Sequence, residues 1–139
     1  MEIVTENAQA TQKLGENFAT TVKNGGVVCL YGDLGSGKTT FTQGLAKGLG
    51  IKKRIVSPTF IFIRQYLPHF YHLDLYRIES LNDAKSLGIE EILSEPKNIV
   101  VIEWPEKIRE ILPEKRTEIF FKYLEENRRS VEIATLRSQ

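Results

Sequence analysis

The stretch Val27-Val-Cys-Leu-Tyr-Gly-Asp-Leu-Gly-Ser-Gly-Lys-Thr39 places three different kinds of local sequence next to one another. Residues 27–31 are apolar and mostly β-favouring, and glycine borders them on both sides, which predicts a buried strand. Residues 32–37 are rich in glycine, and apolar residues recur at helical spacing from Thr39 to Gly50. A buried strand that runs through a glycine-rich turn directly into a helix is typical of α/β domains.

The glycine-rich turn has the spacing Gly-x-x-x-x-Gly-Lys-Thr, which meets every position of the Walker A pattern, or P-loop. Its glycines allow backbone conformations that turn successive N–H groups toward one anion. Lys38 adds a positive charge, Thr39 offers a hydroxyl for Mg²⁺, and the following helix directs its positive dipole end at the same point. Thr40 either lies near the metal or packs within the first helical turn. The residues predicted to hold a nucleotide are Asp33, Leu34, Gly35, Ser36, Gly37, Lys38, Thr39 and Thr40.

Length and composition limit the class of protein. The chain has 139 residues, of which 41% are hydrophobic and 27% charged, as expected for one soluble domain. A formal net charge of +1 provides no global electrostatic signal for binding to nucleic acid or membranes. The apolar runs are far shorter than the roughly 20 residues that cross a bilayer, and the first residues do not resemble a signal peptide. We therefore expect a cytoplasmic protein, in which the single cysteine, Cys29, forms no internal disulfide.

The rest of the chain alternates between helical and extended patterns. Helices are predicted over residues 7–23 and 81–93, the second broken at Gly88. Strands are predicted over residues 60–66, 70–75, 99–102, 117–124 and 131–136. No repeat or linker divides these segments, so residues 1–139 are predicted to form one α/β domain.

The expected nucleotide is ATP. The chain contains neither the Asn-Lys-x-Asp motif that reads guanine nor an Asp-x-x-Gly switch sequence. Adenine is less demanding, because backbone groups or an apolar slot can hold it. The segment from Asn7 to Thr11 precedes a helix that should pack near the site, and it is a candidate to close over the base.

Glu103 directly follows the apolar run of residues 99–102, as an acid follows a Walker B strand. The carboxyl ends of buried strands form the ligand-binding edge of α/β sheets, so Glu103 is predicted to hold Mg²⁺ or to orient the attacking water. The alternative is a solvated glutamate at the end of a strand. Trp104 stands where many ATPases have a second acid, so another carboxylate must come from elsewhere.

Asp74 is the best candidate for that second carboxylate. Strand alternation places His72, Asp74 and Tyr76 on one face, which suggests that His72 and Asp74 form a positioned polar pair. A structural salt bridge or a turn-supporting role is an equally good interpretation of Asp74. The two histidines and the cysteine do not have the spacing of a dedicated metal site.

A loop and several arginines complete the candidates. Ser57-Pro58-Thr59 lies where a loop can reach the γ-phosphate, and Thr59 is predicted to sense the nucleotide state, although the same tripeptide is common in ordinary loops. Arg64, Arg77 and Arg109 could each neutralise charge in the transition state, as could an arginine from a partner.

Four segments occur together in the order and spacing of one family: Gly32-Asp-Leu-Gly-Ser-Gly-Lys-Thr-Thr-Phe41, Val56-Ser-Pro-Thr-Phe60, His72-Leu-Asp-Leu-Tyr-Arg77 and Glu103-Trp-Pro-Glu106. The chain resembles the TsaE (YjeE-type) family, small ATPases of bacterial tRNA threonylcarbamoyladenosine (t⁶A) biosynthesis. The resemblance covers almost the whole chain. It implies a single-domain P-loop NTPase whose mixed, mainly parallel central sheet is flanked by helices.

The resemblance also implies a role and partners. A member of the family hydrolyses ATP slowly on its own and acts with the proteins TsaD and TsaB, so tRNA is reached indirectly through the complex. By this resemblance, Lys38 and Thr39 contact the phosphates and Mg²⁺, Glu103 binds Mg²⁺, Asp74 acts near the attacking water, and Thr59 belongs to a switch loop.

Departures from the family pattern are small. Ser36 and Leu73 replace a common alanine and phenylalanine, and Ile61-Phe-Ile63 replaces a Thr-Leu-Val stretch, which removes one polar contact. Two alternatives remain at this point. A small nucleoside or metabolite kinase would need an arginine-rich lid, which is not evident, and a nucleotide-gated interaction module would hydrolyse ATP only incidentally.

Overall fold

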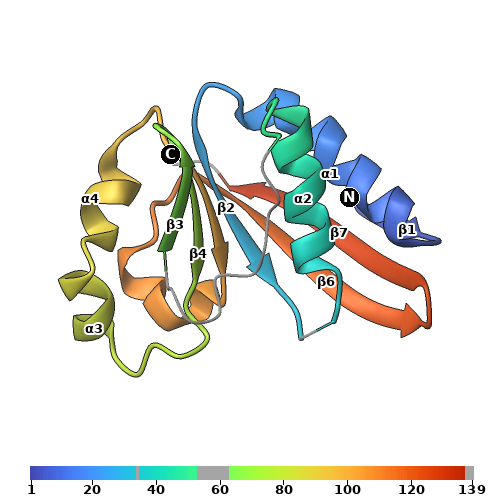
Figure 1. Cartoon of the computed structure of the whole chain (residues 1–139). Coiled ribbons are helices and arrows are strands. Elements are labelled where there is room, and N and C mark those ends of the chain that lie inside the picture. Colours follow the sequence, from blue (N-terminus) through green and yellow to red (C-terminus); the bar gives the residue numbers. More distant parts are fainter. Residues whose placement is uncertain (34, 53–62, 137–139) are drawn as a thin grey trace.

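The computed structural model describes residues 1–33, 35–52 and 63–136, and within them one seven-stranded sheet forms the centre of the molecule (Figure 1). The strand order is β1-β7-β6-β2-β5-β4-β3. The strands are β1 (Glu2–Thr5), β2 (Gly26–Tyr31), β3 (Ile63–Leu67), β4 (Phe70–Asp74), β5 (Ile99–Glu103), β6 (Arg116–Glu125) and β7 (Arg128–Leu136). The helices are α1 (Ala8–Val22), α2 (Lys38–Gly48), α3 (Leu81–Ser86), α4 (Ile89–Ser94) and the 3₁₀ helix η1 (Pro105–Ile111). None of these described helices is long and apolar enough to cross a membrane.

The four central strands, β6, β2, β5 and β4, run parallel to one another. The outer strands β3, β7 and β1 pair antiparallel with their neighbours. Parallel strands need helical crossovers, which cover both faces of the sheet, and such strands are therefore apolar throughout. This constraint explains the unbroken apolar runs of β2 and β5. The predicted α/β fold, a mixed sheet with a parallel centre and flanking helices, is confirmed.

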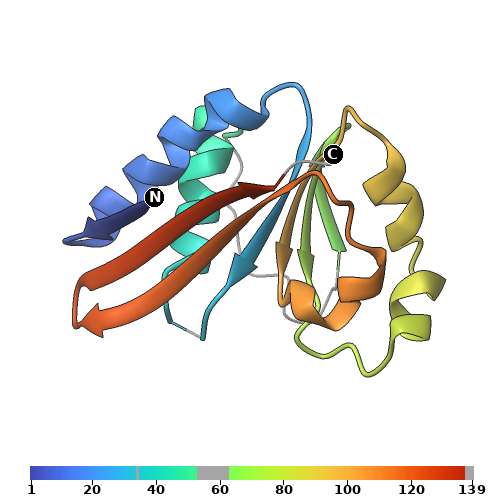
Figure 2. The ribbon, with the colours of Figure 1, turned by 180° about the vertical axis from the view of Figure 1, so that it is seen from behind.

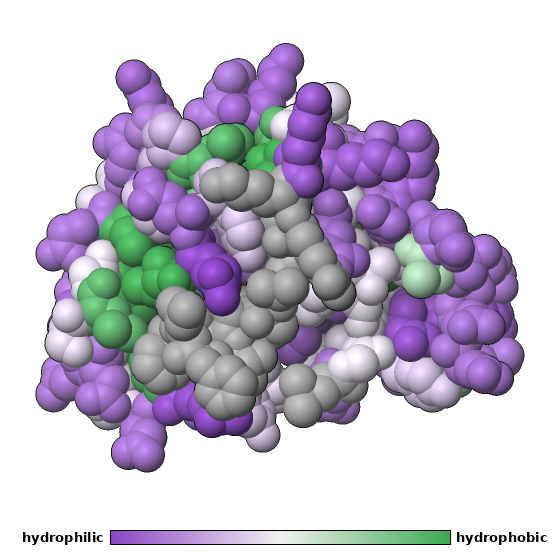
Figure 3. Space-filling view, viewed as in Figure 1, coloured by the Kyte–Doolittle hydropathy of each residue, from purple (hydrophilic) through white to green (hydrophobic). Residues whose placement is uncertain are grey.

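Two apolar cores lie on opposite faces of the sheet, and views from the front and from behind show helices on each side (Figures 1 and 2). On one face, Phe18 of α1 and Phe41 of α2 pack toward Val28 of β2. On the other face, Ile89 of α4 packs toward Ile102 of β5. Figure 3 shows hydrophilic residues over most of the described surface in that view, and hydrophobic residues on the side where α3 and α4 lie.

Helices α1 and α2 approach each other closely because glycines line their contact. A Cβ atom at Gly44 of α2 would overlap the backbone carbonyl oxygen of Gln12 in α1. At Gly15 of α1, a Cβ atom would overlap the carbonyl oxygen of Phe41. Backbone atoms cannot move aside as a flexible side chain does. The close approach matters for the site, because α2 follows the P-loop and α1 fixes its position.

The structure differs from the predictions at the margins of the sheet. Strand β1 was not predicted, because it is a four-residue edge strand that pairs only with β7, from the other end of the chain. The 3₁₀ helix that follows Trp104 was not predicted either. The predicted break at Gly88 is confirmed, since this residue separates α3 from α4 with φ 79°. Residues 60–62 of a predicted strand lie outside the described residues.

We expect Gly44→Ala to lower the free energy of unfolding by about 1–3 kcal/mol, because overpacking against fixed backbone forces α1 and α2 apart. Urea unfolding followed by circular dichroism measures the effect. Lys13→Ala in α1 is the control, since the Lys13 side chain is 66% exposed and its loss should change stability by less than about 0.5 kcal/mol. Equal stabilities of the two variants would contradict the close helix contact.

Candidate functional site

The carboxyl ends of β2, β5 and β4 meet at one edge of the sheet, where α2 begins (Figure 1). A pocket of about 500 Å³ opens at this edge. Open α/β sheets bind ligands at the carboxyl ends of their parallel strands. The residues that line the pocket are Ala8, Thr11, Gly35, Gly37, Lys38, Thr39, Thr40, Asp74, Tyr76, Arg77, Glu103, Glu126, Asn127 and Arg129.

The loop between β2 and α2 requires glycine at two positions. Gly32 has φ 147° and Gly37 has φ 111°, conformations that side chains rarely adopt. A Cβ atom at Gly32 would also lie 2.8 Å from the carbonyl oxygen of Phe121. Gly37 precedes the first residue of α2 and provides no side-chain cap. The first N–H groups of α2 are therefore available to an anion in the pocket.

Lys38, the first residue of α2, is only 4% exposed. Its Nζ donates a hydrogen bond to the carbonyl oxygen of Gly32 (2.6 Å) and lies 4.4 Å from the centre of the Trp104 ring. Burial lowers the pKa of Lys38, while the carboxylates of Glu103 and Asp74 act in the opposite direction. A phosphate oxygen is a stronger partner for an ammonium group than a carbonyl or a ring, so the Lys38 ammonium is well placed to bind an anion.

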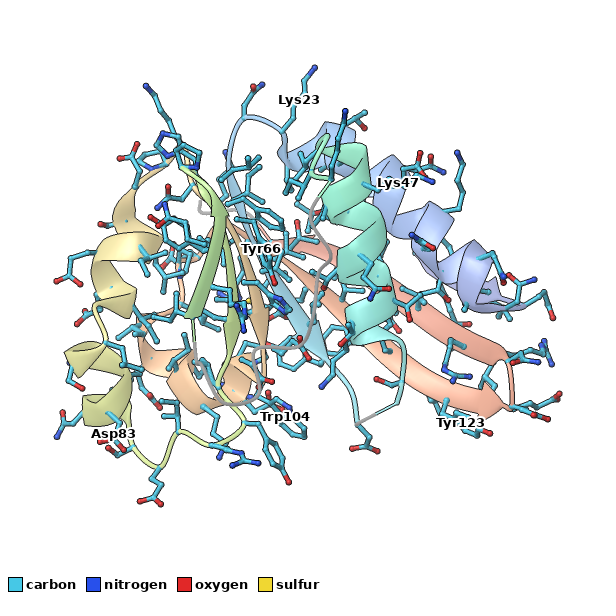
Figure 4. The ribbon with its side chains drawn as sticks, viewed as in Figure 1. Lys23, Lys47, Tyr66, Asp83, Trp104 and Tyr123 are labelled. Atoms are coloured by element: carbon cyan, nitrogen blue, oxygen red, sulfur yellow. The ribbon has the colours of Figure 1, made fainter. Side chains whose placement is uncertain are left out.

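Trp104 adopts an unusual backbone conformation directly after β5. Its φ of 61° and ψ of 48° are left-handed, and among the described residues it alone has a positive φ without being glycine. Such a conformation costs on the order of 1–3 kcal/mol, and the surrounding structure has to impose it. The ring packs against Tyr76 at a centroid distance of 5.1 Å and, like the Lys38 ammonium, lies at the pocket end of the sheet (Figure 4).

Two carboxylates lie next to each other at the ends of neighbouring strands. Asp74 of β4 is paired in register with Glu103 of β5, and both side chains line the pocket. They are 8% and 4% exposed, respectively. The backbone N–H of Tyr76 donates to Oδ1 of Asp74 (3.0 Å), which holds this carboxylate at the turn after β4.

The prediction that His72 pairs with Asp74 is wrong, because His72 pairs with Glu103. Nε2 of His72 lies 2.7 Å from Oε2 of Glu103, so the histidine is paired across the strands rather than along its own strand. Alternation within one segment correctly places His72 and Asp74 on one face. It contains no information about the neighbouring strand, whose register brings Glu103 to that face as well.

The turn between β6 and β7 contributes a third group of residues, Glu126, Asn127 and Arg129, which the sequence analysis missed. Nη1 of Arg129 donates to the carbonyl oxygens of Glu125, Glu126 and Arg128, at 3.0, 3.4 and 2.9 Å. A Cβ atom at Gly37 would lie 3.7 Å from Cγ of Arg129, which places this arginine against the P-loop. A polar turn far along the chain carries no motif that could have indicated this position.

The comparisons with known proteins agree on one family. Residues 5–131 match the family described as "Threonylcarbamoyl adenosine biosynthesis protein TsaE". The chain belongs to the TsaE family. It is 39% identical to "tRNA threonylcarbamoyladenosine biosynthesis protein TsaE" of Bacillus subtilis over 131 residues, 91% of this chain and 80% of the relative. The protein of the same name from Treponema pallidum is 38% identical over 136 residues, 96% of this chain and 100% of the relative. The crystal structure of Bacillus subtilis YdiB superimposes with a TM-score of 0.76 and 33% identity, covering 98% of this chain and 84% of that one.

The structure brings together most of the residues that the TsaE resemblance indicated. Asp74 and Glu103 line the pocket with Gly35, Gly37, Lys38, Thr39 and Thr40. Ser36 is buried, and Asp33 is exposed outside the lining of the pocket. Leu34 and Thr59 lie outside the described residues. Of the three candidate arginines, Arg77 lines the pocket, whereas Arg64 and Arg109 are not among its described lining residues. From the segment Asn7 to Thr11, which was predicted to close over the base, Ala8 and Thr11 line the pocket.

The donor set of the pocket fits Mg²⁺ held together with a nucleotide. Among the described residues, no three His, Cys, Asp or Glu side chains form a cluster that could hold a metal ion by themselves. The pocket instead offers the hydroxyl of Thr39 and the carboxylates of Glu103 and Asp74. Mg²⁺ usually takes one or two carboxylates and completes its coordination with water and substrate phosphates. This pocket therefore suits a cation that arrives with its phosphates.

We expect Lys38→Met to weaken the binding of a non-hydrolysable ATP analogue by at least about tenfold. A hydrogen bond to a charged group contributes about 1.5–3 kcal/mol, and 1.4 kcal/mol corresponds to a factor of ten. Isothermal titration calorimetry measures the change. Lys47→Met, at an exposed position of the same helix, removes an equal charge outside the pocket and should leave the affinity within about twofold. Equal affinities of the two variants would exclude the Lys38 ammonium as a phosphate ligand.

Proposed function

We propose that this chain, as one domain, is a Mg²⁺-dependent ATPase that supports t⁶A formation in tRNA together with TsaD and TsaB. One observation carries the proposal. A buried ammonium, an uncapped helix N-terminus, a threonine hydroxyl and two carboxylates from neighbouring strands line a single pocket. The names of the relatives support the role in t⁶A biosynthesis.

The P-loop side of the pocket binds the phosphate chain. The N-terminal N–H groups of α2 and the ammonium of Lys38 provide positive charge at the start of the helix. Thr39, one residue further along α2, turns its hydroxyl to the cation. Thr39, Glu103 and Asp74 would hold a Mg²⁺ that arrives with the nucleotide, and the ion would supply positive charge against the charge that develops on the phosphates.

The strand side of the pocket supports hydrolysis. Glu103 ends β5 beside Lys38 and serves the cation, either directly or through its water ligands. Asp74 lines the pocket next to Glu103, and the N–H of Tyr76 holds its Oδ1, so its carboxylate is proposed to orient the attacking water. Thr59 is proposed to sense the γ-phosphate from a switch loop.

The third side of the pocket takes the nucleoside. Ala8 and Thr11 at the start of α1 and Asn127 of the β6–β7 turn line this side, away from the two carboxylates. Small side chains and an amide suit a base that is held by shape and a few hydrogen bonds, which fits adenine.

Low intrinsic turnover is part of the proposal, and the two arginines among the described lining residues support it. Arg77 is an exposed lining residue, and Arg129 is engaged by the carbonyl groups of its own turn. An arginine fixed in trans by a partner commonly accelerates phosphoryl transfer. We therefore propose that TsaD and TsaB stimulate the ATPase, and that the ATPase sustains the transfer reaction without contacting the modified base.

The test is a phosphate-release assay on the full chain with Mg·ATP, with and without purified TsaD, TsaB and tRNA. We expect slow turnover alone and at least a several-fold increase with the partners. Turnover that the partners leave unchanged would contradict the proposed cooperation. Phosphate that appears on an added nucleoside would replace the proposal with a kinase, and nucleotide binding without any turnover would replace it with a nucleotide-gated interaction module.

We expect Asp74→Asn to lower kcat by about 10²–10⁴-fold, the usual contribution of general acid–base catalysis, while nucleotide affinity stays within about threefold. Glu103→Gln should reduce kcat and also raise the Mg²⁺ concentration that turnover requires. Steady-state kinetics over a range of Mg²⁺ concentrations distinguishes the two. Equal losses of affinity and turnover in Asp74→Asn would assign Asp74 a structural role, and full turnover by Glu103→Gln would remove Glu103 from the site.

A further inference from the structure

His72 is a fully buried polar ring at the border between the apolar core beneath α1 and α2 and the two carboxylates of the pocket. It is 0% exposed, and it is the one polar member among the largest fully buried side chains of the described residues. Its neighbours along β4 and β5, Phe70 and Val101, belong to the core beneath α1 and α2. A buried polar group without a hydrogen-bond partner destabilises the fold by about 1–3 kcal/mol. The position of His72 therefore calls for a reason beyond packing.

The hydrogen bonds of the ring point to that reason. Nε2 lies 2.7 Å from Oε2 of Glu103, and an ionised carboxylate only accepts hydrogen bonds, so Nε2 is the donor. Nδ1 is buried and has no hydrogen-bond partner among the described residues. The ring is therefore oriented through Nε2 alone, and its described polar contact is with the Glu103 carboxylate.

We propose that His72 is a positioning residue that fixes the carboxylate of Glu103 toward the nucleotide-bound cation. The inference rests on the proposed role of Glu103. The hydrogen bond between Nε2 and Oε2 fixes one end of the Glu103 carboxylate, whose residue lines the pocket. Hydrogen bonds to the far side of a metal-binding group orient it, and their loss typically costs 10–100-fold in metal affinity or activity.

The orientation of Glu103 needs a restraint because the Lys38 ammonium, which lines the same pocket, competes with the cation for its carboxylate. Lys38 and Glu103 both line the pocket, and the Glu103 carboxylate acts to raise the pKa of Lys38 against the effect of burial. A glutamate side chain has three rotatable bonds, and without a restraint it could turn toward this ammonium instead of the cation. His72 is held by the backbone pairing of β4 with β5, so its ring provides a rigid anchor on the opposite side of the carboxylate.

Two variants of His72 that carry an amide side chain test whether the position of the hydrogen-bond donor matters or only the presence of a polar group. His72→Gln places its amide donor near the location of Nε2, whereas His72→Asn places the same donor near the location of Nδ1, too short to reach Glu103. The readout is the strengthening of binding of a non-hydrolysable ATP analogue by Mg²⁺, measured by calorimetry across a Mg²⁺ titration. We expect His72→Asn to raise the half-saturating Mg²⁺ concentration by about 10–100-fold and His72→Gln to stay within about threefold of the unmodified chain. Binding of the analogue without Mg²⁺ should not change in either variant.

The second measurement asks whether His72 acts through Glu103. In a Glu103→Gln background, His72→Asn should cause no further loss of the Mg²⁺ effect. Thermal melting confirms folding, and His72→Leu, which keeps a side chain of similar bulk without a donor, repeats the test if the asparagine variant melts below the assay temperature.

Four results would overturn the inference. Equal Mg²⁺ dependence of His72→Gln and His72→Asn would show that the reach of the donor is irrelevant. A further loss in the Glu103→Gln background would show that His72 acts by another route. If Mg²⁺ does not strengthen nucleotide binding in the unmodified chain, the proposed function itself fails, and this inference fails with it. A normal Mg²⁺ effect that His72→Asn leaves intact would overturn the inference alone.

Discussion

The constraint on which the site depends is the conversion of a buried strand into a helix within a few residues. β2 lies in the middle of the parallel strands and ends at Tyr31, and α2 begins at Lys38. The chain reverses in this distance through the positive φ values of Gly32, Gly35 and Gly37, conformations that side chains rarely adopt. The reversal leaves the N-terminus of α2 without a side-chain cap, so the loop that connects the two elements also leaves N–H groups available to an anion in the pocket.

The position of α2 relative to the sheet is set by a second constraint, the close packing of α1 against it. Gly15 and Gly44 allow backbone atoms of the two helices to approach without intervening side chains. α1 also brings Ala8 and Thr11 to the pocket, and the hydroxyls of Thr11 and Thr5 share a hydrogen bond of 2.7 Å. The helix contact and the site are thus parts of one arrangement, in which the spacing of α1 and α2 determines the width of the pocket beside the P-loop.

The core of the fold and the P-loop could be predicted from the sequence because their signals are local. An apolar run bordered by glycine specifies β2, and an apolar run that ends at Glu103-Trp104-Pro105 specifies β5, each without reference to any other part of the chain. The features that the sequence did not predict depend on contacts between distant segments. β1 is extended because β7 pairs with it, and Arg129 lies near Gly37 because the β6–β7 hairpin passes the P-loop. The partner of His72 likewise depends on the register between β4 and β5, which periodicity within one strand cannot reveal.

The charged side chains of the pocket affect how favourably a phosphate chain binds there. The described lining of the pocket carries the cations Lys38, Arg77 and Arg129 and the acids Asp74, Glu103 and Glu126, and of these Lys38, Asp74 and Glu103 are buried. A phosphate chain alone would bring further negative charge toward these acids, which is unfavourable at short range in a low-dielectric environment. A divalent cation that arrives with the phosphates reverses the sign of this interaction, so that the same carboxylates favour the nucleotide. On the proposed function, Asp74 and Glu103 would favour a metal–nucleotide complex over the free nucleotide, most strongly with Glu103 held in one orientation by His72.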